Sequence, residues 1–550
     1  MKNENWWRWG NPEEAQNLKD YPKLIVFLED LWKVKLNKDF QIPTSFNVPN
    51  SQFSKDDFFS TFSNLKENQF SNSEEDRLKY AIARSYHDII KVFKDVIENY
   101  PDFILFPESE EDVQYILKVC NTKDIKLITY SGGSNVTGAT QRDEHYSKVA
   151  VLNMTRMKSL LNIDEKSHTA TFQTGIFGPE LEQILNKKGY TLGHFPQSFE
   201  FSTLGGWIAT RSAGQESGLY GKIEDLVLGL KVICPSGTIE HKDFPKHASG
   251  IDFHSLFIGS EGTLGVITAA KMKIAKLPKS YEWVVSIFKD FQSGSNAIQE
   301  MVQSGIHASI TRLSDADETK MLSLMSHSKK SFIKTQVEKL VKFHLKRKGY
   351  TKPCILMMRF AIKNDNDSSQ IITATKICKN NGGNLLPSNV STTWEENRFA
   401  LPYLRDTMVE HRILIDTFET VTYWDNLNPL YKGVHQALAE KSDYFDKNGL
   451  LFCHISHAYE TGASLYFSML IRQEKNHELE QWQSYKNIVS DAITSLGGAI
   501  SHHHGVGEDH QKWYIQKLSP NAQKLLLAIK KELDPNNILN PGKLFDGKRI

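Results

Sequence analysis

Three consecutive histidines, His502, His503 and His504, stand near the C-terminal end of the chain, between Ser501 and a Gly-Val-Gly turn. Imidazole changes its charge near neutral pH, so adjacent imidazoles can relay protons. Imidazole is also a metal ligand, and alternate side chains of an extended segment share one face. His502 and His504 could therefore bind one ion together. The remaining alternative is a solvated run of histidines without chemistry.

A glycine-rich turn, Ser131-Gly132-Gly133-Ser134-Asn135-Val136-Thr137-Gly138, follows an apolar run at 125–130. Small residues let backbone N–H groups approach a diphosphate, and the hydroxyl groups add donors. A turn of this kind is often only a turn between strands. It does not match the Rossmann fingerprint, because no GxGxxG opens a helix here.

Two further segments are rich in glycine, serine and threonine: 196–214 and 259–268. Three such loops, each next to a strand, can surround one extended anionic ligand from several sides. The predicted cofactor-binding residues are Ser131, Gly132, Gly133, Ser134, Asn135, Val136, Thr137, Gln197, Ser198, Ser202, Thr203, Gly206, Thr210, Arg211, Ser212, Glu261, Gly262, Gly265, Val266 and Ile267.

The elements that must position these loops can be read from local patterns. Phe103–Phe106 is a short apolar run that Pro107 ends, and Ser109–Asp112 has the spacing of a capping box that opens a helix. Further strands are predicted at 125–130, 355–360 and 465–470. The predicted domains are a helical N-terminal region (1–95), a first domain (96–279), a second domain in which helices alternate with strands (280–500), and a histidine-containing loop with a C-terminal helical segment (501–550).

The composition is that of an ordinary globular enzyme. With 550 residues, 40% of them hydrophobic and 24% charged, the chain is too long for one core. The net charge of +1 gives no reason to expect a nucleic-acid partner. Five scattered cysteines predict free thiols in a reducing compartment. We see no apolar run of membrane-spanning length, no secretory signal and no peroxisomal Ser-Lys-Leu tail, so a cytoplasmic protein is expected.

The three loops, together with the ending Leu533–Lys543, resemble the vanillyl-alcohol-oxidase superfamily with its PCMH-type FAD-binding domain. The resemblance covers residues 99–279 and the C-terminal tail. It implies an α+β fold with a two-subdomain FAD-binding domain and an α/β substrate, or cap, domain, the flavin lying between the two. Members with covalent flavin often carry a histidine in the first loop. None is present here, so non-covalent FAD is expected.

Within this superfamily, four segments of the second domain resemble alkyldihydroxyacetonephosphate synthase, also called alkylglycerone-phosphate synthase. They are Ser309–Leu313, Leu401–Asp406, Thr461–Phe467 and Ser501–Gly507. The resemblance implies an FAD-dependent transferase of ether lipid biosynthesis. Such an enzyme exchanges the acyl group of acyl-dihydroxyacetone phosphate for a fatty alcohol through a flavin N5 adduct, without net redox change.

The resemblance also implies roles for single residues. Tyr466 matches the catalytic base, and its free pKa of ~10 would need lowering by cationic neighbours. His503 and His504 could supply that field and relay protons, and His502 belongs to the same catalytic set. Arg405 matches the arginine that holds the substrate phosphate, where a planar fork suits two oxygens. Arg312 matches another arginine that the family requires. Without the resemblance, a tyrosine in a strand and isolated arginines would be read as core and surface residues.

Two other functions stay open. D-lactate and other 2-hydroxyacid dehydrogenases of the superfamily bind a metal through histidines and a glutamate. Tyr466 and His503 stand where we place two of those ligands, so no metal is expected, although His454 and His457 lie nearby. The third alternative is a flavin-binding lipid adaptor without catalysis, which would have no need of a base.

Residues 329–348 carry eight lysines and arginines against one acid, Glu338, with apolar residues at helical spacing. A basic amphipathic helix can lie among lipid headgroups, which predicts peripheral membrane contact. An ordinary surface helix is the alternative. Lipid substrates and a homodimer complete the expected partners.

Overall fold

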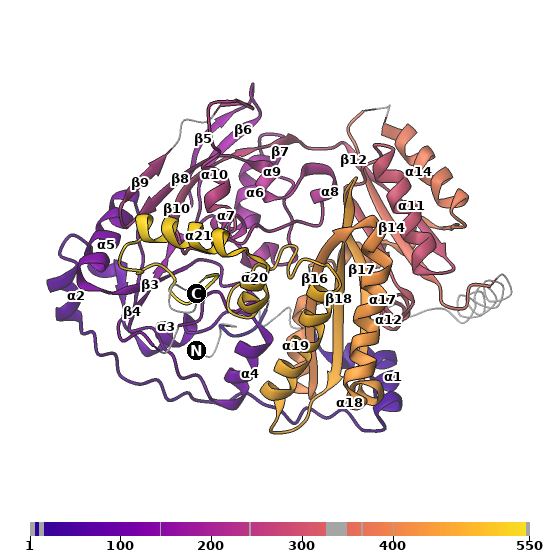
Figure 1. Ribbon diagram of the computed structural model, residues 1–550, viewed down its shortest axis with the longest axis horizontal. Helices are drawn as coiled ribbons and strands as arrows, with labels where there is room; N and C mark the ends of the chain where they lie inside the picture. Colours follow the sequence, from indigo (N-terminus) through magenta and orange to yellow (C-terminus); the bar gives the residue numbers. More distant parts are fainter. Residues whose placement is uncertain are drawn as a thin grey trace.

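Two β-rich halves and a returning C-terminal segment make up the computed structural model, which describes residues 6–9, 16–142, 145–240, 244–325, 349–364, 367–399 and 401–545. In Figure 1 the first half is mainly violet to magenta, and the second half runs from pink to orange. The yellow C-terminal helices lie back against the first half. The predicted combination of a two-subdomain binding domain and a second α/β domain is thus the observed architecture.

The first sheet of the first half has the strand order β1 (Phe70–Ser71), β2 (Phe103–Leu105), β4 (Val149–Asn153), β3 (Lys126–Tyr130). The strands β2, β4 and β3 pair in parallel and are almost continuously buried, as their apolar sequences require. Helix α5 (Glu110–Lys123) begins with the predicted capping box. The Ser109 hydroxyl accepts from the N–H of Asp112 at 3.1 Å, and the Asp112 carboxylate accepts from the N–H of Ser109 at 3.2 Å.

The second sheet of this half is antiparallel, in the order β5 (Leu160–Asp164), β6 (Thr169–Gln173), β10 (Val266–Lys273), β8 (Val227–Cys234), β9 (Gly237–Glu240). A small pair, β11 (Ala275–Lys276) and β7 (Tyr190–Thr191), lies beside it. Its helices are α6 (Gly178–Asn186), α7 (Leu204–Ala209), α8 (Ser217–Tyr220), α9 (Ile223–Leu226) and α10 (His254–Phe257). The three predicted loops therefore follow β3, surround the start of α7 and precede β10.

The second half is built on one antiparallel sheet of seven strands, ordered β15 (Asn384–Leu386), β12 (Ser280–Phe288), β14 (Cys354–Ile362), β13 (Ile310–Ser314), β17 (Gly449–Ala458), β18 (Gly462–Arg472), β16 (Ile413–Tyr423). One face packs into the largest core under α11 (Phe291–Gln303), α14 (Ser368–Asn380), α17 (Trp424–Lys441) and α19 (Glu478–Ser495). The other face carries α12 (Ala316–Met325), α15 (Thr392–Glu396) and α16 (Leu401–Glu410), with α18 (Asp443–Asn448) at the side.

The alternation along β18 decides which side chains can do chemistry. Leu465, Phe467 and Met469 point into the large core, so Tyr466 and Ser468 must point to the opposite face, toward the first half. This position agrees with the predicted strand at 465–470.

The C-terminal segment completes the first sheet. After α20 (Gln511–Lys517) and α21 (Pro520–Leu533), Leu127 of β3 donates its N–H to the carbonyl of Ile538 at 2.7 Å. Its own carbonyl accepts the N–H of Asn540 at 2.8 Å. The Asp534 carboxylate holds this turn by accepting the N–H groups of Ile538 and Leu539.

The N-terminal region contains less helix than predicted. Its helices are α1 (Pro22–Trp32), α2 (Lys55–Thr61), α3 (Glu74–Lys79) and α4 (Tyr86–Lys94). Residues 33–54 form neither helix nor strand, and they include Pro43 and Pro49, which lack a backbone donor. Within the described parts of the chain, no helix has the length and apolar character needed to cross a membrane.

Candidate active site

A cavity of about 390 Å³ lies between the three loops of the first half and the face of the seven-stranded sheet that carries Tyr466. The residues predicted from the sequence that line it are Ser131, Gly132, Gly133, Ser134, Asn135, Val136, Gln197, Ser198, Thr203, Gly206, Thr210, Ser212, Glu261, Gly262, Gly265, Ile267, Arg312, Arg405, Tyr466, His503 and His504. Segments that are more than 300 residues apart in the chain therefore meet at one cavity.

The glycine-rich turn can exist only with glycine at its two central positions. A Cβ at Gly132 would lie 2.1 Å from the carbonyl oxygen of Phe201. Gly133 has φ +62°, and its Cβ would lie 1.9 Å from the Tyr130 hydroxyl. The hydroxyls of Ser131 and Thr203, 2.6 Å apart, join this turn to the second loop. The close approach of the two loops forms one wall of the cavity.

Several buried polar atoms that line the cavity lack a partner among the described residues. They are Thr129 Oγ1, Thr140 Oγ1 and Asn540 Oδ1. Leaving such atoms unpaired costs ~1–3 kcal/mol each, so they fit a polar ligand in the cavity. Hydroxyl, amide and backbone donors around small residues are the groups that a dinucleotide such as FAD requires. The residues present therefore fit the predicted cofactor.

Four predicted cofactor residues and one predicted catalytic residue do not line the cavity. Arg211 forms an exposed ion pair with Glu224, and Val266 is fully buried in the core. The Ser202 hydroxyl accepts from the Trp207 indole and donates to the Ser198 carbonyl, so it is committed within its own loop. Thr137 and His502 lie behind the residues that line the wall: Thr137 hydrogen-bonds the amide of Asn135, and His502 turns away toward Tyr459.

Tyr466 lies between two imidazole rings. Its ring is stacked on His454, with centroids 4.8 Å apart and planes at 22°, and on His503 at 6.0 Å and 23°. The edge of His504 approaches at 5.6 Å. Burial raises the pKa of Tyr466 to about 12, although a hydrogen bond with Thr417 acts in the opposite direction.

His503 and His504 do not supply the positive charge that was expected to lower the pKa of Tyr466. Burial keeps the pKa values of His503 and His504 below the ordinary value, against the attraction of the Glu419 carboxylate. The imidazoles next to Tyr466 are therefore neutral, and the predicted lowering of the tyrosine pKa by cationic histidines is absent.

Arg312 supplies the fixed charge near Tyr466. Its guanidinium donates to His454 Nε2 at 2.9 Å and to Glu318 Oε1 at 2.7 Å, and Glu318 also contacts His454 Nδ1 at 2.9 Å. Although burial acts to raise it, Arg312 and His454 hold the pKa of Glu318 at about 2. Glu318 and His454 line the cavity as well. An ordinary glutamate in a helix gives no sequence signal for this role.

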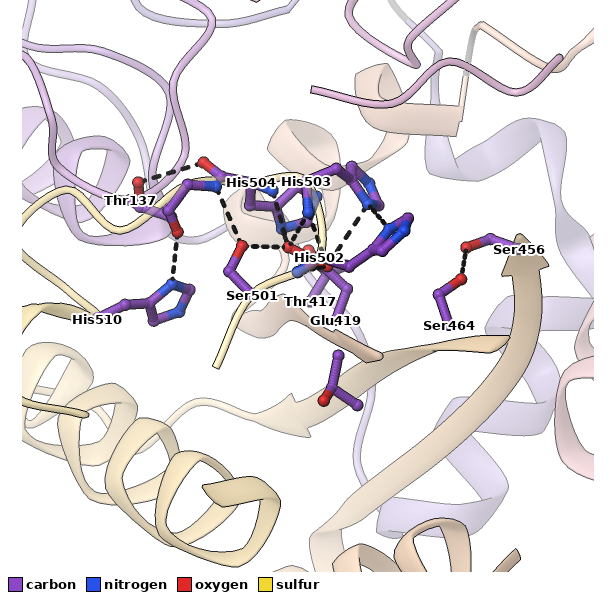
Figure 2. A network of polar contacts seen from close by, with 12 residues as sticks. Thr137, Thr417, Glu419, Ser456, Ser464, Ser501, His502, His503, His504 and His510 are labelled. Atoms are coloured by element: carbon purple, nitrogen blue, oxygen red, sulfur yellow. Dashed lines mark hydrogen bonds and ion pairs between the residues drawn. The ribbon is translucent and has the colours of Figure 1, made fainter. Parts of the chain in front are cut away.

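Glu419 on β16 holds the histidine loop from one side (Figure 2). Its carboxylate accepts the backbone N–H groups of His503 at 3.0 Å and His504 at 2.8 Å, together with that of His502. The Ser501 hydroxyl donates at 2.6 Å. Burial acts to raise the pKa of Glu419, and the hydrogen bond from the Ser501 hydroxyl to its charged form acts to lower it.

Glu261, from the first half, holds the other end of the same loop. It accepts the N–H groups of Val506 at 2.5 Å and Gly507 at 2.7 Å, and burial raises its pKa to about 7 against these two bonds. Two carboxylates from different halves thus fix the backbone of one loop. The position of His503 and His504 depends on both halves.

Arg405 lies at the first turns of α16, where it lines the cavity beside Trp9. Its Nε donates to Asp406 at 2.9 Å, and Nη1 donates to the carbonyl of Arg84. The Asp406 carboxylate also accepts the N–H of Trp9 at 2.7 Å. The guanidinium is therefore held in a fixed orientation at the edge of the cavity, as an anion-binding arginine requires.

The part of the cavity under α12 and α16 is apolar, and sequence patterns did not predict it. Its lining consists of Met321, Leu322, Met325, Leu404, Met408, Ile415, Phe452 and Leu470. These residues come from two helices and three strands. Each of them would be read as ordinary core in its own element, so no local signal distinguishes them.

Two family models cover most of this architecture. Residues 101–242 match an FAD binding domain, and residues 277–544 match the C-terminal domain of FAD linked oxidases. A likeness to p-cresol methylhydroxylase, with a TM-score of 0.67 at 14% identity over 91% of this chain and 99% of that chain, supports the fold alone. The fold and the cavity define an FAD-dependent enzyme of the vanillyl-alcohol-oxidase superfamily.

More specific relatives follow from the sequence. The chain is 33% identical to alkyldihydroxyacetonephosphate synthase of Dictyostelium discoideum and 30% identical to that of Trypanosoma brucei brucei, in both cases over 85% of this chain and 77% of the relative. A solved alkyldihydroxyacetonephosphate synthase matches with a TM-score of 0.83 at 28% identity, over 98% of both chains. The mitochondrial D-lactate dehydrogenase [cytochrome] of Arabidopsis thaliana is more distant, at 26% identity over 81% of this chain and 74% of the relative. The chain belongs to the alkyldihydroxyacetonephosphate synthase family.

Proposed function

We propose that this enzyme exchanges the acyl group of acyl-dihydroxyacetone phosphate for a fatty alcohol, a step of ether lipid synthesis. One observation carries the proposal: a single cavity joins the loops that fit FAD, an oriented arginine, a buried tyrosine between imidazoles and an apolar arm. A phosphorylated ketone with a long chain needs each of these parts. When bound, FAD supplies an electrophilic ring at which the substrate carbon is exchanged without net oxidation.

Arg405 binds and orients the substrate phosphate, because its fork is fixed by Asp406 at the cavity edge. The apolar arm under α12 and α16 receives the alkyl chain and excludes water from it. With head and chain held at two places, the carbon beside the ketone is brought to Tyr466.

Tyr466 removes a proton from that carbon. Because its pKa is about 12 in the free protein, the phenol first has to lose its own proton. His503 and His504, whose rings lie against the phenol, are the nearest groups through which this proton can leave, and the positive charge of Arg312 acts to lower the pKa of Tyr466. Arg312 then stabilises the phenolate through its positive charge.

The dehydrogenase alternative is disfavoured by the same residues. A metal site built as in the 2-hydroxyacid dehydrogenases would need ligands where Tyr466 and His503 stand. The phenol of Tyr466 is instead stacked between imidazoles. A pure flavin-binding adaptor is disfavoured as well, because it has no use for the buried network of Arg312, Glu318 and His454.

One incubation separates the three functions. The purified protein is given acyl-dihydroxyacetone phosphate and a fatty alcohol, and in parallel D-lactate or a related acid. Formation of the ether product supports the synthase, and bleaching of the flavin by the hydroxyacid supports the dehydrogenase. If neither result is obtained, the adaptor function remains.

Lipid substrates follow from this proposal, whereas two partner predictions rest on the sequence only. The basic segment 329–348 lies within 326–348, outside the described residues, so peripheral membrane contact stays a prediction. A homodimer and a cytoplasmic location are likewise predictions that the structure does not test.

A further inference from the structure

Three imidazoles converge beside the cavity, next to the end of the second loop at Gly214. One nitrogen each of His457, His502 and His503 lies within 4.8 Å of the corresponding nitrogens of the other two rings. His457 comes from the end of β17, and the other two come from the loop held by Glu419. Ring centroids are 4.9 Å apart for His457 and His502, and 5.7 Å for His457 and His503.

The protein fixes the tautomers from outside. His457 Nε2 faces the carbonyl oxygen of Gly214 at 2.9 Å, so this nitrogen carries the proton, and Nδ1 accepts from the Ser456 hydroxyl at 2.9 Å, a hydrogen bond that an ion would replace. His502 Nε2 lies 2.7 Å from the Tyr459 hydroxyl. Such outer partners orient metal-binding histidines in known sites.

Two of the three nitrogens, those of His502 and His503, are close to the separation that an ion requires. His502 Nδ1 and His503 Nδ1 are 2.9 Å apart, sharing one proton as a hydrogen bond. Zinc–nitrogen bonds of ~2.0–2.1 Å in a tetrahedron place two ligand nitrogens about 3.4 Å apart. Small ring rotations would therefore replace the shared proton by a metal ion.

The charged groups around the three imidazoles act in opposite directions on a bound cation. The Glu419 carboxylate lies 3.5 Å from His503 Nδ1 and offsets positive charge. The positive charge of Lys222, which donates to the carbonyl of His502 at 3.2 Å, disfavours a cation at this site.

We propose that His457, His502 and His503 form a binding site for one divalent transition-metal ion of the zinc type. Three neutral imidazoles with a fourth position left for water form a known zinc ligand set. This site shares the position of His503 with the dehydrogenase type of metal site but does not include the position of Tyr466. The ion is not needed for the exchange reaction.

Occupation has a consequence for the reaction, which rests on the proposed function. His503 contributes its ring both to the cavity wall and to this site. An ion held on Nδ1 removes the proton that His503 shares with His502 and leaves the ring unable to accept another from Tyr466. Zinc is therefore an inhibitor of the enzyme.

The test measures zinc itself, so it does not depend on activity. Flavin-loaded protein is treated with a chelator, dialysed and titrated with Zn²⁺ by calorimetry. We expect saturable binding of one ion per chain in the wild type. His457→Gln should lose it while keeping its flavin, because the His457 ring does not line the cavity. His477→Gln, which removes an exposed imidazole at the start of α19, should bind like the wild type.

A second variant covers the case in which His457→Gln does not fold. Tyr459→Phe leaves all three imidazoles and removes only the outer partner of His502, so affinity should fall by ~10- to 100-fold. Absence of saturable binding in the wild type, or unchanged binding in His457→Gln, overturns the site. If zinc binds but wild-type turnover is not inhibited, the shared role of His503 is wrong. A protein that binds zinc but makes no ether product refutes the proposed function alone.

Discussion

The phenol ring of Tyr466 lies parallel to the imidazole of His454, with centroids 4.8 Å apart and planes at 22°. This stacking connects the tyrosine to Arg312, since the same imidazole accepts from the guanidinium at 2.9 Å. The His454 imidazole thus contacts both the Tyr466 ring, which carries the reacting oxygen, and the guanidinium of Arg312. The first prediction concerns that oxygen.

Tyr466→Phe should abolish turnover while folding and flavin content stay nearly unchanged. The substitution keeps the stacked ring and removes only the oxygen that accepts the proton. Loss of a general base costs ~10²–10⁴-fold in rate. Exchange of the substrate C1 hydrogen with solvent, followed by mass spectrometry, should disappear together with product formation. Wild-type exchange in the Phe variant would place the base elsewhere, with His503 or His504 next to be tested.

Arg405→Lys should weaken the apparent affinity for the phosphorylated substrate although charge is kept. A lysine cannot hold both Asp406 and the phosphate through a planar fork. Loss of one charged hydrogen bond is worth ~1.5–3 kcal/mol, or roughly ten- to more than a hundredfold. Initial rates over a range of substrate concentrations give the value, and an unchanged affinity would show that Arg405 is not the phosphate ligand.

The pKa of Glu261 predicts how stability depends on pH. Its folded-state value of about 7 lies above the ordinary 4.5, so the folded state binds more protons than the unfolded state between these values. The contribution of Glu261 is therefore full at pH 4 and is lost as pH rises toward 7. At ~1.36 kcal/mol for each pKa unit, the loss is on the order of 3 kcal/mol.

Denaturant unfolding of the wild type and of Glu261→Gln, between pH 4 and 8, measures this contribution. The difference in unfolding free energy should shift in favour of the variant as pH rises, because glutamine has no proton to lose. A difference that is constant across this range would mean that the Glu261 carboxyl group has an ordinary pKa. Fluorescence of released flavin monitors whether the cofactor is retained.

FAD should be released intact by acid or heat. The first loop contains no histidine that could form a covalent bond to the flavin, and the cavity is lined there by serine, glycine and asparagine. The purified protein should be yellow, and the supernatant after precipitation should contain all of the flavin. Colour that stays with the denatured chain would contradict the prediction.

Chelation should not lower the exchange activity. The catalytic groups named above are a phenol, imidazoles and guanidinium groups, none of which needs an ion. Activity after treatment with a chelator is compared with that of untreated enzyme. Activity lost to the chelator and restored by an ion would favour the dehydrogenase alternative.

Short sequence patterns predicted the helix starts and strands that depend on a few adjacent residues. The capping box at Ser109 and the strand at 465–470 were read correctly, because a helix start and a buried strand depend on a few adjacent residues. The glycine turn was recognised because only glycine fits at Gly132 and Gly133. Residues 33–54 were predicted as part of a helical region but form no helix, because prolines and packing outweigh composition there.

Long-range contacts explain what could not be predicted. Glu419 looks like any glutamate in a strand until its carboxylate meets the backbone of His503 and His504. The apolar arm is assembled from residues that each resemble core. The sign of the Tyr466 pKa shift depends on burial and on neutral histidines, neither of which is visible in a motif. The roles of the individual site residues remain predictions for the experiments above.

The return of the C-terminal segment to β3 sets a constraint on how the protein matures. Asn540 donates to the carbonyls of Ala139 and Glu261, joining the first and third loops, and Leu539 is paired with Leu127. During synthesis these loops leave the ribosome hundreds of residues before their last partner. The flavin cavity is therefore finished only after the segment around Asn540 has left the ribosome. A chain that stops before Asn540 should be unable to retain FAD, which makes cofactor loading a late checkpoint of assembly.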